Sequence, residues 1–132
     1  MLKILDIMNS QNQPIILVVD DIATNIALVK AMLRNKNYEV ISAQSGAQAL
    51  KIVEEQKPDI IILDIMMPGM DGYEVLARLR SNEETKDIKV VMLSAISKEE
   101  DIQKAMELGA DDYITKPIVV KKLHDALDKL TV

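Results

Sequence analysis

Ile15-Ile16-Leu17-Val18-Val19 is an unbroken aliphatic run that leads directly into Asp20-Asp21. Ile60-Ile61-Ile62-Leu63 leads in the same way into Asp64, and two further apolar runs end at Ser94 and at Thr115-Lys116-Pro117. Aliphatic runs without polar alternation are typical of central strands in a parallel sheet, which helices cover on both faces. If these runs are neighbouring strands, their carboxyl ends bring three acids, a hydroxyl and an amine to one edge.

Strand-like and helix-like segments alternate five times along the chain. This alternation predicts a (βα)5 doubly wound α/β fold with a five-stranded parallel sheet. The predicted strands are Ile15–Val19, Tyr38–Ala43, Ile60–Leu63, Val90–Leu93 and Asp112–Thr115. The predicted helices are Thr24–Asn35, Ala47–Gln56, Tyr73–Arg80, Lys98–Leu108 and Val119–Leu130.

Local signals mark several of the predicted helix ends. Ser45-x-x-Gln48, Asp71-x-x-Glu74 and Ser97-x-x-Glu100 have the pattern of capping boxes at helix N-termini. Gly109 follows Leu108 at a position where a helix C-terminus needs a left-handed residue. Pro68-Gly69 predicts a turn in the segment after Asp64.

Composition sets limits on the function. The chain has 132 residues, 48% of them hydrophobic, which fits one domain with a substantial core. Its net charge of -5 argues against general nucleic-acid binding. The absence of Cys excludes disulfides and thiol catalysis and suits a reducing cytoplasm. No apolar stretch approaches the length of a membrane span.

The predicted edge of the sheet would bring together Asp20, Asp21, Asp64, Ser94 and Lys116, and ligands of doubly wound folds bind at such edges. Each residue also has a simpler explanation, because an aspartate at a strand-to-helix junction is often only a helix N-cap. Three carboxylates packed together repel, so the cluster needs a cation or shifted pKa values. Carboxylates without His or Cys favour Mg²⁺ or Mn²⁺ over Zn²⁺.

With these residues in place, the chain resembles a receiver domain of two-component response regulators, the family that includes the chemotaxis response regulator. The resemblance covers roughly residues 15–130. It implies the flavodoxin-like strand order 2-1-3-4-5, which is the known order of the chemotaxis response regulator and comes from the resemblance alone. The matching motifs are Val18-Val19-Asp20-Asp21, Ile62-Leu63-Asp64-Ile65-Met66-Met67-Pro68-Gly69-Met70-Asp71-Gly72, Met92-Leu93-Ser94-Ala95 and Gly109-Ala110-Asp111-Asp112-Tyr113-Ile114-Thr115-Lys116-Pro117.

The resemblance implies a phosphoacceptor and a metal site. Asp64 resembles the carboxylate that attacks the phosphorus of a phosphohistidine on a partner kinase. Asp20 and Asp21 resemble the acidic pair that holds Mg²⁺, with Asp64 and the backbone carbonyl of Met66 as further ligands. General chemistry supports this assignment, because phosphoryl transfer needs charge neutralisation and in-line positioning more than covalent machinery.

Three further residues acquire roles from the resemblance. Lys116 resembles the lysine that pairs with a phosphoryl oxygen, and Ser94 resembles the hydroxyl residue that hydrogen-bonds another. Tyr113 resembles the aromatic switch residue three positions before that lysine. If Ser94 moves toward a phosphoryl group, a space opens behind it and Tyr113 can turn inward. A local charge would then change a distant surface, which is the usual logic of a switch.

The sequence thus predicts a signalling switch that catalyses only its own phosphorylation and dephosphorylation. A histidine kinase or histidine phosphotransfer protein is the expected donor, and the output partner is unknown. The module is expected to be cytoplasmic, with no direct nucleic-acid or membrane contact, as a monomer or phosphorylation-dependent dimer. The alternative is the same module taken from a hybrid histidine kinase or multi-domain regulator. An aspartyl-phosphate phosphatase is disfavoured, because it needs an acid where Met66 stands.

Two expectations concern residues outside this core pattern. Residues 1–14 are expected to be an N-terminal extension or linker, with 15–132 forming the receiver domain. Met66 and Ile96 lie two positions after Asp64 and Ser94, where family members influence attack by water. Because neither side chain can orient a water by hydrogen bonding, slow autodephosphorylation is expected. The output face, by resemblance, comprises the helix 98–108, the strand 112–115 and the helix 119–130.

Overall fold

The five apolar runs form one parallel sheet in the order β2-β1-β3-β4-β5, which confirms the expected flavodoxin-like topology. The computed structural model describes residues 13–131. The strands are β1 (Ile15–Val19), β2 (Glu39–Ala43), β3 (Ile60–Asp64), β4 (Lys89–Ser94) and β5 (Asp112–Thr115). The helices are α2 (Ala23–Met32), α3 (Gly46–Glu55), α4 (Gly72–Arg80), α5 (Glu99–Glu107) and α6 (Val120–Leu130).

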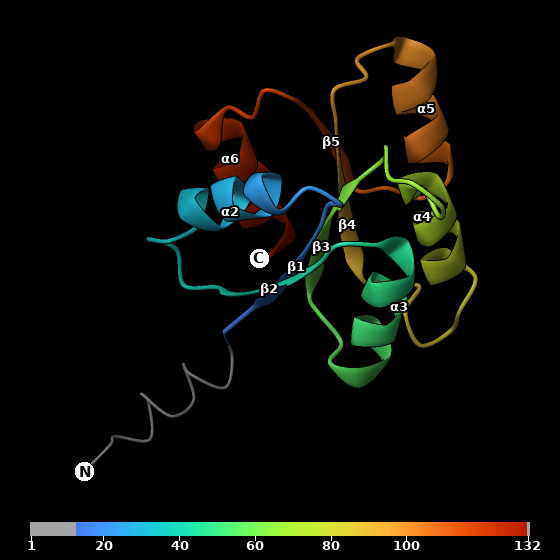
Figure 1. Ribbon diagram of the computed structural model, residues 1–132, viewed down its shortest axis with the longest axis horizontal. Helices are drawn as coiled ribbons and strands as arrows, with labels where there is room; N and C mark the ends of the chain where they lie inside the picture. The colour runs from blue at the N-terminus through green and yellow to red at the C-terminus, as the bar shows by residue number, and fades with distance from the viewer. Residues whose placement is uncertain (1–12, 132) are drawn as a thin grey trace.

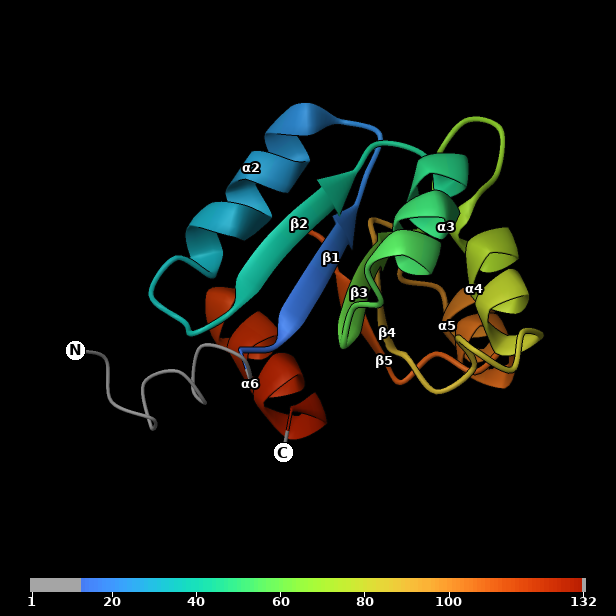
Figure 2. The same cartoon turned by 90° about the horizontal axis from the view of Figure 1, so that it is seen from below.

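Helices cover both faces of the sheet in three layers (Figure 1). Helices α2 and α6 lie on one face, and α3, α4 and α5 lie on the other (Figure 2). Strand β1 shows why, because its successive side chains point to opposite faces. Ile16 and Val18 pack with residues of α2 and α6, whereas Leu17 and Val19 pack with residues of α3 and α4. Each aliphatic run therefore supplies two cores, which explains its lack of polar alternation.

Two of the three predicted capping boxes supply a side-chain cap. The Ser45 hydroxyl accepts a hydrogen bond from the Gln48 N–H at 3.1 Å, and the Asp71 carboxylate accepts one from the Glu74 N–H at 2.9 Å. The Ser97 prediction is wrong, since the N-cap of α5 is Lys98 and has no side-chain cap. Gly109 has φ +103° after α5, as expected for a left-handed C-terminal residue.

The first helix is shorter than predicted. It ends at Met32 rather than Asn35, because the chain tightens into a turn after Met32. The N–H of Arg34 bonds to the Ala31 carbonyl at 3.3 Å, an i-to-i−3 contact typical of a fraying helix end. Strands β3 and β4 are each longer than predicted and include Asp64 and Ser94 as their last residues.

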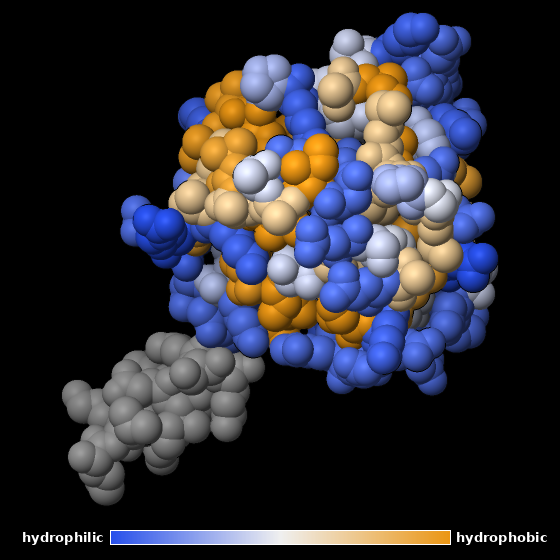
Figure 3. Space-filling view, in the orientation of Figure 1, coloured by the Kyte–Doolittle hydropathy of each residue, from blue (hydrophilic) through white to orange (hydrophobic). Residues whose placement is uncertain are grey.

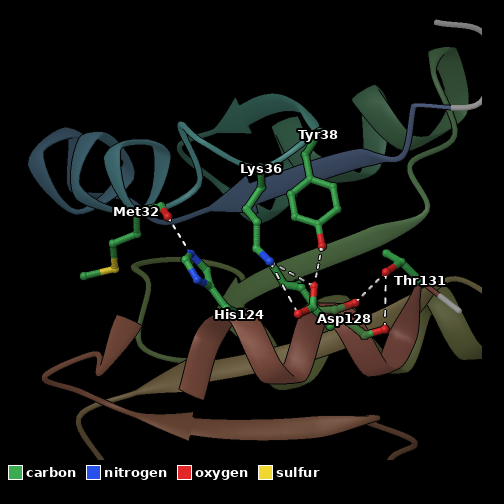
Figure 4. Close-up of polar contacts among 7 residues, drawn as sticks. Met32, Lys36, Tyr38, His124, Asp128 and Thr131 are labelled. Atoms are coloured by element: carbon green, nitrogen blue, oxygen red, sulfur yellow. Dashed lines mark hydrogen bonds and ion pairs between the residues drawn. The ribbon is translucent and has the colours of Figure 1, made fainter. Parts of the chain in front are cut away.

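Polar side chains fasten α6 to the α2–β2 connection (Figure 4). The Asp128 carboxylate accepts from the Lys36 ammonium at 3.2 Å and from the Tyr38 hydroxyl at 3.4 Å. One turn earlier, His124 Nε2 lies 2.7 Å from the Met32 carbonyl oxygen, at the end of α2. We call these contacts, made by Met32, Lys36, Tyr38, His124 and Asp128, the α6 clasp. Together with the apolar core beneath it, the α6 clasp fixes α6 to α2.

The described residues contain no helix that is both long and apolar enough to cross a membrane. Residues 1–12 of the expected N-terminal extension lie outside the described residues, so that expectation stays a prediction.

Candidate functional site

The strand register brings the predicted residues to the carboxyl edge of the sheet. Val19 on β1 is paired with Leu63 on β3, so Asp20 and Asp64 are the next residues on adjacent strands. Asp64 is paired with Leu93, which precedes Ser94, and Ser94 is paired with Thr115, which precedes Lys116. The residues that end four neighbouring strands therefore meet at one place, as the sequence predicted.

Three carboxylates form the centre of the site. Oxygen atoms of Asp20, Asp21 and Asp64 all lie within 4.8 Å of one another. Asp20 and Asp64 are buried, with 2% and 5% of their surface exposed, while Asp21 is half-buried. Two carboxylates without water around them repel strongly, so this grouping is unfavourable unless positive charge lies nearby.

Lys116 supplies positive charge on one side of the cluster. Its Nζ lies 3.3 Å from Asp20 Oδ2 and 3.7 Å from Asp64 Oδ1. The Lys116 backbone N–H also donates to the Ser94 carbonyl at 2.8 Å, which continues the strand pairing up to the site. The Lys116-Pro117 peptide bond is cis. One ammonium thus lies beside a cluster of three carboxylates.

The pKa of the Asp64 carboxyl lies above its ordinary value, chiefly because burial disfavours the charged form. The Lys116 ammonium opposes this rise most strongly, and a hydrogen bond from the Met66 backbone lowers the pKa as well. The neighbouring Asp20 and Asp21 carboxylates raise it further. A cation beside Asp64 would therefore lower this pKa and favour the ionised carboxylate.

Asp20 also has the local role that the simpler explanation gave it. Its Oδ1 accepts from the Ile22 N–H at 2.9 Å and from the Asn25 side-chain amide at 3.4 Å. These contacts hold one carboxylate oxygen at the start of α2, while Oδ2 faces Lys116. Asp20 is thus both a turn former and a member of the cluster. Sequence reasoning did not identify Asn25, whose amide carries no recognisable motif.

Ser94 and Tyr113 lie next to each other beside the cluster. Ser94 is fully buried, and its hydroxyl oxygen accepts from the Ile96 N–H at 3.1 Å. The Tyr113 hydroxyl donates to the Ile96 carbonyl at 2.7 Å, so its half-buried ring is tucked under the β4–α5 loop. Burial raises the pKa of the Tyr113 phenol, while the adjacent Ser94 hydroxyl lowers it. The Tyr113 ring therefore lies beside Ser94 and under the β4–α5 loop, and its role as a switch residue stays a prediction.

Gly72 permits the close packing of α4 against the end of β3. Its N–H donates to the Ile65 carbonyl at 2.8 Å. A Cβ at this position would overlap the Asp64 carbonyl oxygen and would lie 2.7 Å from Ile65 Cα. Only glycine fits such an approach without moving backbone. The sequence contained Gly72 within a motif, but local patterns do not reveal which backbone it would approach.

Exposed apolar side chains lie around the site. Figure 3 shows apolar surface over α2 and α6. The exposed large apolar residues of these elements and their preceding loops are Ile22, Leu28, Val119 and Val120, and Met66 is exposed on the β3–α4 loop. Apolar groups rimming a charged centre are a feature of surfaces that contact other proteins.

The donor set fits a hard divalent cation. Three carboxylates offer oxygen ligands within 4.8 Å of one another, and none of these groups is His or Cys. Mg²⁺ and Mn²⁺ prefer oxygen ligands of this kind. Such an ion would also offset the negative charge that Lys116 leaves uncompensated.

The fold and this edge define a class: doubly wound α/β proteins with a carboxylate cluster and a lysine at the carboxyl ends of their strands. A family model described as the response regulator receiver domain matches residues 16–128. The chain belongs to the response regulator receiver domain family of two-component systems. It is therefore mainly a signalling domain, and its acidic cluster fits the phosphorylation and metal site of that family.

Relatives in sequence and structure agree with this family. Response regulator PleD of Caulobacter vibrioides is 46% identical over 103 residues, which cover 78% of this chain and 23% of PleD. The phosphate regulon transcriptional regulatory protein PhoB of Pseudomonas aeruginosa is 41% identical, over 82% of this chain and 47% of PhoB. The chain thus spans about a quarter to a half of these relatives' length.

Solved structures match nearly the whole described domain. A putative response regulator from Chloroflexus aurantiacus has a TM-score of 0.86 at 33% identity, covering 90% of this chain and 98% of its own. The chemotaxis protein CheY4 of Vibrio cholerae has a TM-score of 0.83 at 29% identity, covering 89% of this chain and 98% of its own.

Proposed function

We propose that the chain is a phosphorylation-dependent switch in which Asp64 accepts a phosphoryl group from a histidine kinase or a histidine phosphotransfer protein. The observation that carries this proposal is the buried Asp64 carboxylate with Lys116 Nζ at 3.7 Å and two further carboxylates beside it. A buried aspartate in this setting is a nucleophile that neighbouring positive charge keeps ionised.

The transfer would proceed by displacement at phosphorus. An Asp64 carboxylate oxygen forms a bond to phosphorus as the bond from phosphorus to the donor imidazole nitrogen breaks, and the imidazole leaves. Lys116 pairs with a phosphoryl oxygen and offsets charge that develops in the transition state. The Ser94 hydroxyl donates to another phosphoryl oxygen, since its oxygen already accepts from Ile96. The cluster thus positions the reacting groups, and it needs no covalent intermediate other than the acyl phosphate.

We assign the metal site to Asp20, Asp21, Asp64 and the backbone carbonyl of Met66. Mg²⁺ or Mn²⁺, when bound, supplies positive charge that favours ionised Asp64 and the phosphoryl oxygens. The raised pKa of Asp64 fits this assignment, because burial and the neighbouring Asp20 and Asp21 carboxylates disfavour the charged form that a cation would stabilise.

Phosphorylation would be read out through Ser94 and Tyr113. A phosphoryl group on Asp64 favours the arrangement in which Ser94 faces it and Tyr113 lies inward, and the population shifts accordingly. The affected surface comprises α5, β5 and α6. We further propose a cytoplasmic setting, a receiver domain over residues 15–132 and an extension or linker over 1–14. Ile22, Leu28 and Val119 are exposed where a donor protein would contact the site.

A larger parent protein is the second possibility. The region matched is less than half the length of PleD and of PhoB. This partial coverage supports a multi-domain regulator or a hybrid kinase as the parent protein. A turnover phosphatase has less support, because the position two after Asp64 is held by Met66, whose exposed side chain cannot act as an acid or base.

Incubation with acetyl phosphate and Mg²⁺, followed by intact-mass measurement, tests the function. One added phosphoryl group is expected on the wild type, and none in Asp64→Asn or after EDTA. Asp71→Asn is the matched control, because it makes the same change seven residues later at a helix cap that Asn can also form. A persistent adduct in Asp64→Asn would overturn the assignment of Asp64.

A further inference from the structure

Helix α5 is the least firmly packed helix on its face of the sheet. Within α5, Ala105 is the one buried residue, whereas α4 buries Gly72, Val75, Leu76 and Leu79. Elements with few buried apolar contacts open more readily than the rest of a domain. Single polar contacts therefore have a larger share in fixing α5 than in fixing α4 or α6.

Tyr73 on α4 makes such contacts with the first turns of α5. Its hydroxyl donates to the Asp101 carbonyl at 3.2 Å. The Lys104 ammonium lies 4.2 Å from the centre of the Tyr73 ring, within the range of a cation–π interaction. The ring itself packs against the core beneath α4. Tyr73 thus joins a well-packed helix to a loosely packed one.

The segment 96–101 joins the Asp101 carbonyl, which accepts from Tyr73, to the Ile96 carbonyl, which accepts from Tyr113. The Asp101 N–H donates to the Lys98 carbonyl at 3.0 Å, which sets the start of α5. Two residues before Lys98, the Ile96 carbonyl accepts from the Tyr113 hydroxyl at 2.7 Å. Tyr73 and Ile96 also line the same surface groove, together with Met66 and Asp71. Two tyrosines from different elements therefore hold the segment 96–101 from its two ends.

We propose that Tyr73 is a positioning residue of the switch: by fixing the first turn of α5, it keeps the Ile96 carbonyl within reach of Tyr113. The place of the Tyr113 ring beside Ser94 then depends on a contact made at the other end of the segment 96–101. The consequence for phosphoryl binding rests on the proposed function, whereas the coupling between the two tyrosines does not.

Ring-labelled tyrosine makes this coupling directly observable, because the chain contains three Tyr and no Phe or Trp. In protein carrying ¹³C in its tyrosine rings, Tyr73→Phe is expected to shift the Tyr113 signals and to speed amide exchange over residues 98–102. Tyr38→Phe is the matched control, since it removes a phenol hydroxyl that contacts Asp128 on the other face of the sheet. It should leave the Tyr113 signals in place.

Lys104→Met tests the second contact of Tyr73. It removes the ammonium above the ring and keeps most of the side-chain length, so a smaller shift in the same direction is expected. Thermal unfolding of each variant shows whether the domain stays folded. Unchanged Tyr113 signals in Tyr73→Phe, or an equal shift in Tyr38→Phe, would overturn the proposal.

Binding of beryllium trifluoride with Mg²⁺, a mimic of the phosphoryl group, tests the consequence. Tyr73→Phe is expected to weaken the apparent affinity about fivefold, the factor that corresponds to roughly one neutral hydrogen bond. Equal affinity would overturn the positioning role and leave Tyr73 a structural contact. If the wild type itself fails to bind, the proposed function is wrong, and the ring signals still decide whether the tyrosines are coupled.

Discussion

Charged side chains are matched in sign at one end of the sheet and left with excess negative charge at the other. At the amino end of β4, Arg80 makes four hydrogen bonds: to the carbonyls of Gly109, Lys86 and Ile88 at 2.7–3.0 Å, and to the Asp111 carboxylate at 3.1 Å. The same Asp111 oxygen accepts from the Val90 N–H at 2.8 Å. At the carboxyl end, three carboxylates lie together beside one ammonium.

This difference separates a structural charge from a functional one. The Arg80–Asp111 pair is matched in sign and saturated with backbone partners, so it has little left to offer a ligand. The carboxyl end retains excess negative charge, and the pKa of Asp64 is raised as a result of burial and of its acidic neighbours. Uncompensated charge is tolerated where a ligand will compensate it.

The largest expected effect comes from removing the hydrogen bonds of Arg80 at the amino end of β4. Arg80→Ala leaves the Asp111 carboxylate and three carbonyls without their partner, and we expect it to destabilise the domain by about 2–3 kcal/mol. Urea unfolding measures the loss. Arg78→Ala is the control, because Arg78 pairs with Glu74 at 3.9 Å on an exposed surface and should change stability by less than about 0.5 kcal/mol. Equal losses of stability in the two variants would show that the additional hydrogen bonds of Arg80 do not stabilise the domain.

The next effect concerns the lifetime of the phosphoryl group on Asp64, at the carboxyl end of the sheet. Met66→Asn or Ile96→Lys places a polar group near Asp64 that can orient a water, and we expect phosphoryl loss to accelerate about tenfold. Decay of the phosphorylated mass over time measures it. Met106→Asn makes the same change at an exposed Met on α5, away from the site, and should leave the decay unaltered. Unchanged decay in both site variants contradicts the prediction.

A smaller effect, of opposite sign to Arg80→Ala, is expected from removing charge at the carboxyl end. In protein without divalent cations, Asp64→Asn relieves repulsion and should stabilise the fold by about 1 kcal/mol, roughly 4 °C in Tm. Because folding raises the pKa of Asp64, ionisation costs stability as pH rises through the range above 3.8. The advantage of Asp64→Asn should therefore be present at neutral pH and shrink toward pH 4.

Addition of Mg²⁺ sharpens the same comparison. A bound cation stabilises the folded wild type in proportion to its occupancy, so Mg²⁺ should raise the Tm of the wild type and narrow the gap to Asp64→Asn. Asp59→Asn, which alters a carboxylate at the start of the sheet that accepts from the Ile15 N–H, should keep the full response to Mg²⁺. If added Mg²⁺ left the Tm of the wild type unchanged, this result would count against the metal assignment.

The smallest effect is expected at an exposed ion pair. Lys121 and Asp125 approach to 2.8 Å, closer than Arg80 and Asp111, but both side chains are largely in solvent. Lys121→Ala should leave the urea midpoint unchanged within error. A marked shift of the urea midpoint would show that the distance between the charged atoms governs the energy of these ion pairs, rather than their burial and their additional hydrogen bonds.

Sequence patterns predicted the parts of the fold that depend on local order. The aliphatic runs, the alternation of elements and the position of Gly109 needed only neighbouring residues. The strand ends then placed Asp20, Asp64, Ser94 and Lys116 correctly, because a parallel sheet aligns its carboxyl ends. The family resemblance, and not periodicity, supplied the strand order.

Contacts between distant segments could not be predicted in the same way. Arg80 bonds to carbonyls up to 29 residues away, and backbone carbonyls have no sequence signature. Tyr73 and Asn25 depend on the packing of one helix beside another element. The cap expected from Ser97 failed because α5 begins one residue later, at a boundary that a local pattern fixes only within a residue or two.

The α6 clasp has a consequence for protein engineering. Because Lys36, Tyr38 and His124 tie the far end of α2 to α6 (Figure 4), a dye on the exposed side of α2 would be held firmly and would lie outside the proposed responding surface of α5, β5 and α6. A small dye attached in the β4–α5 loop, between the two tyrosines that hold it, would sit on the side that responds. A pair of labels, one on each side, would turn the domain into a ratiometric sensor with its own internal reference.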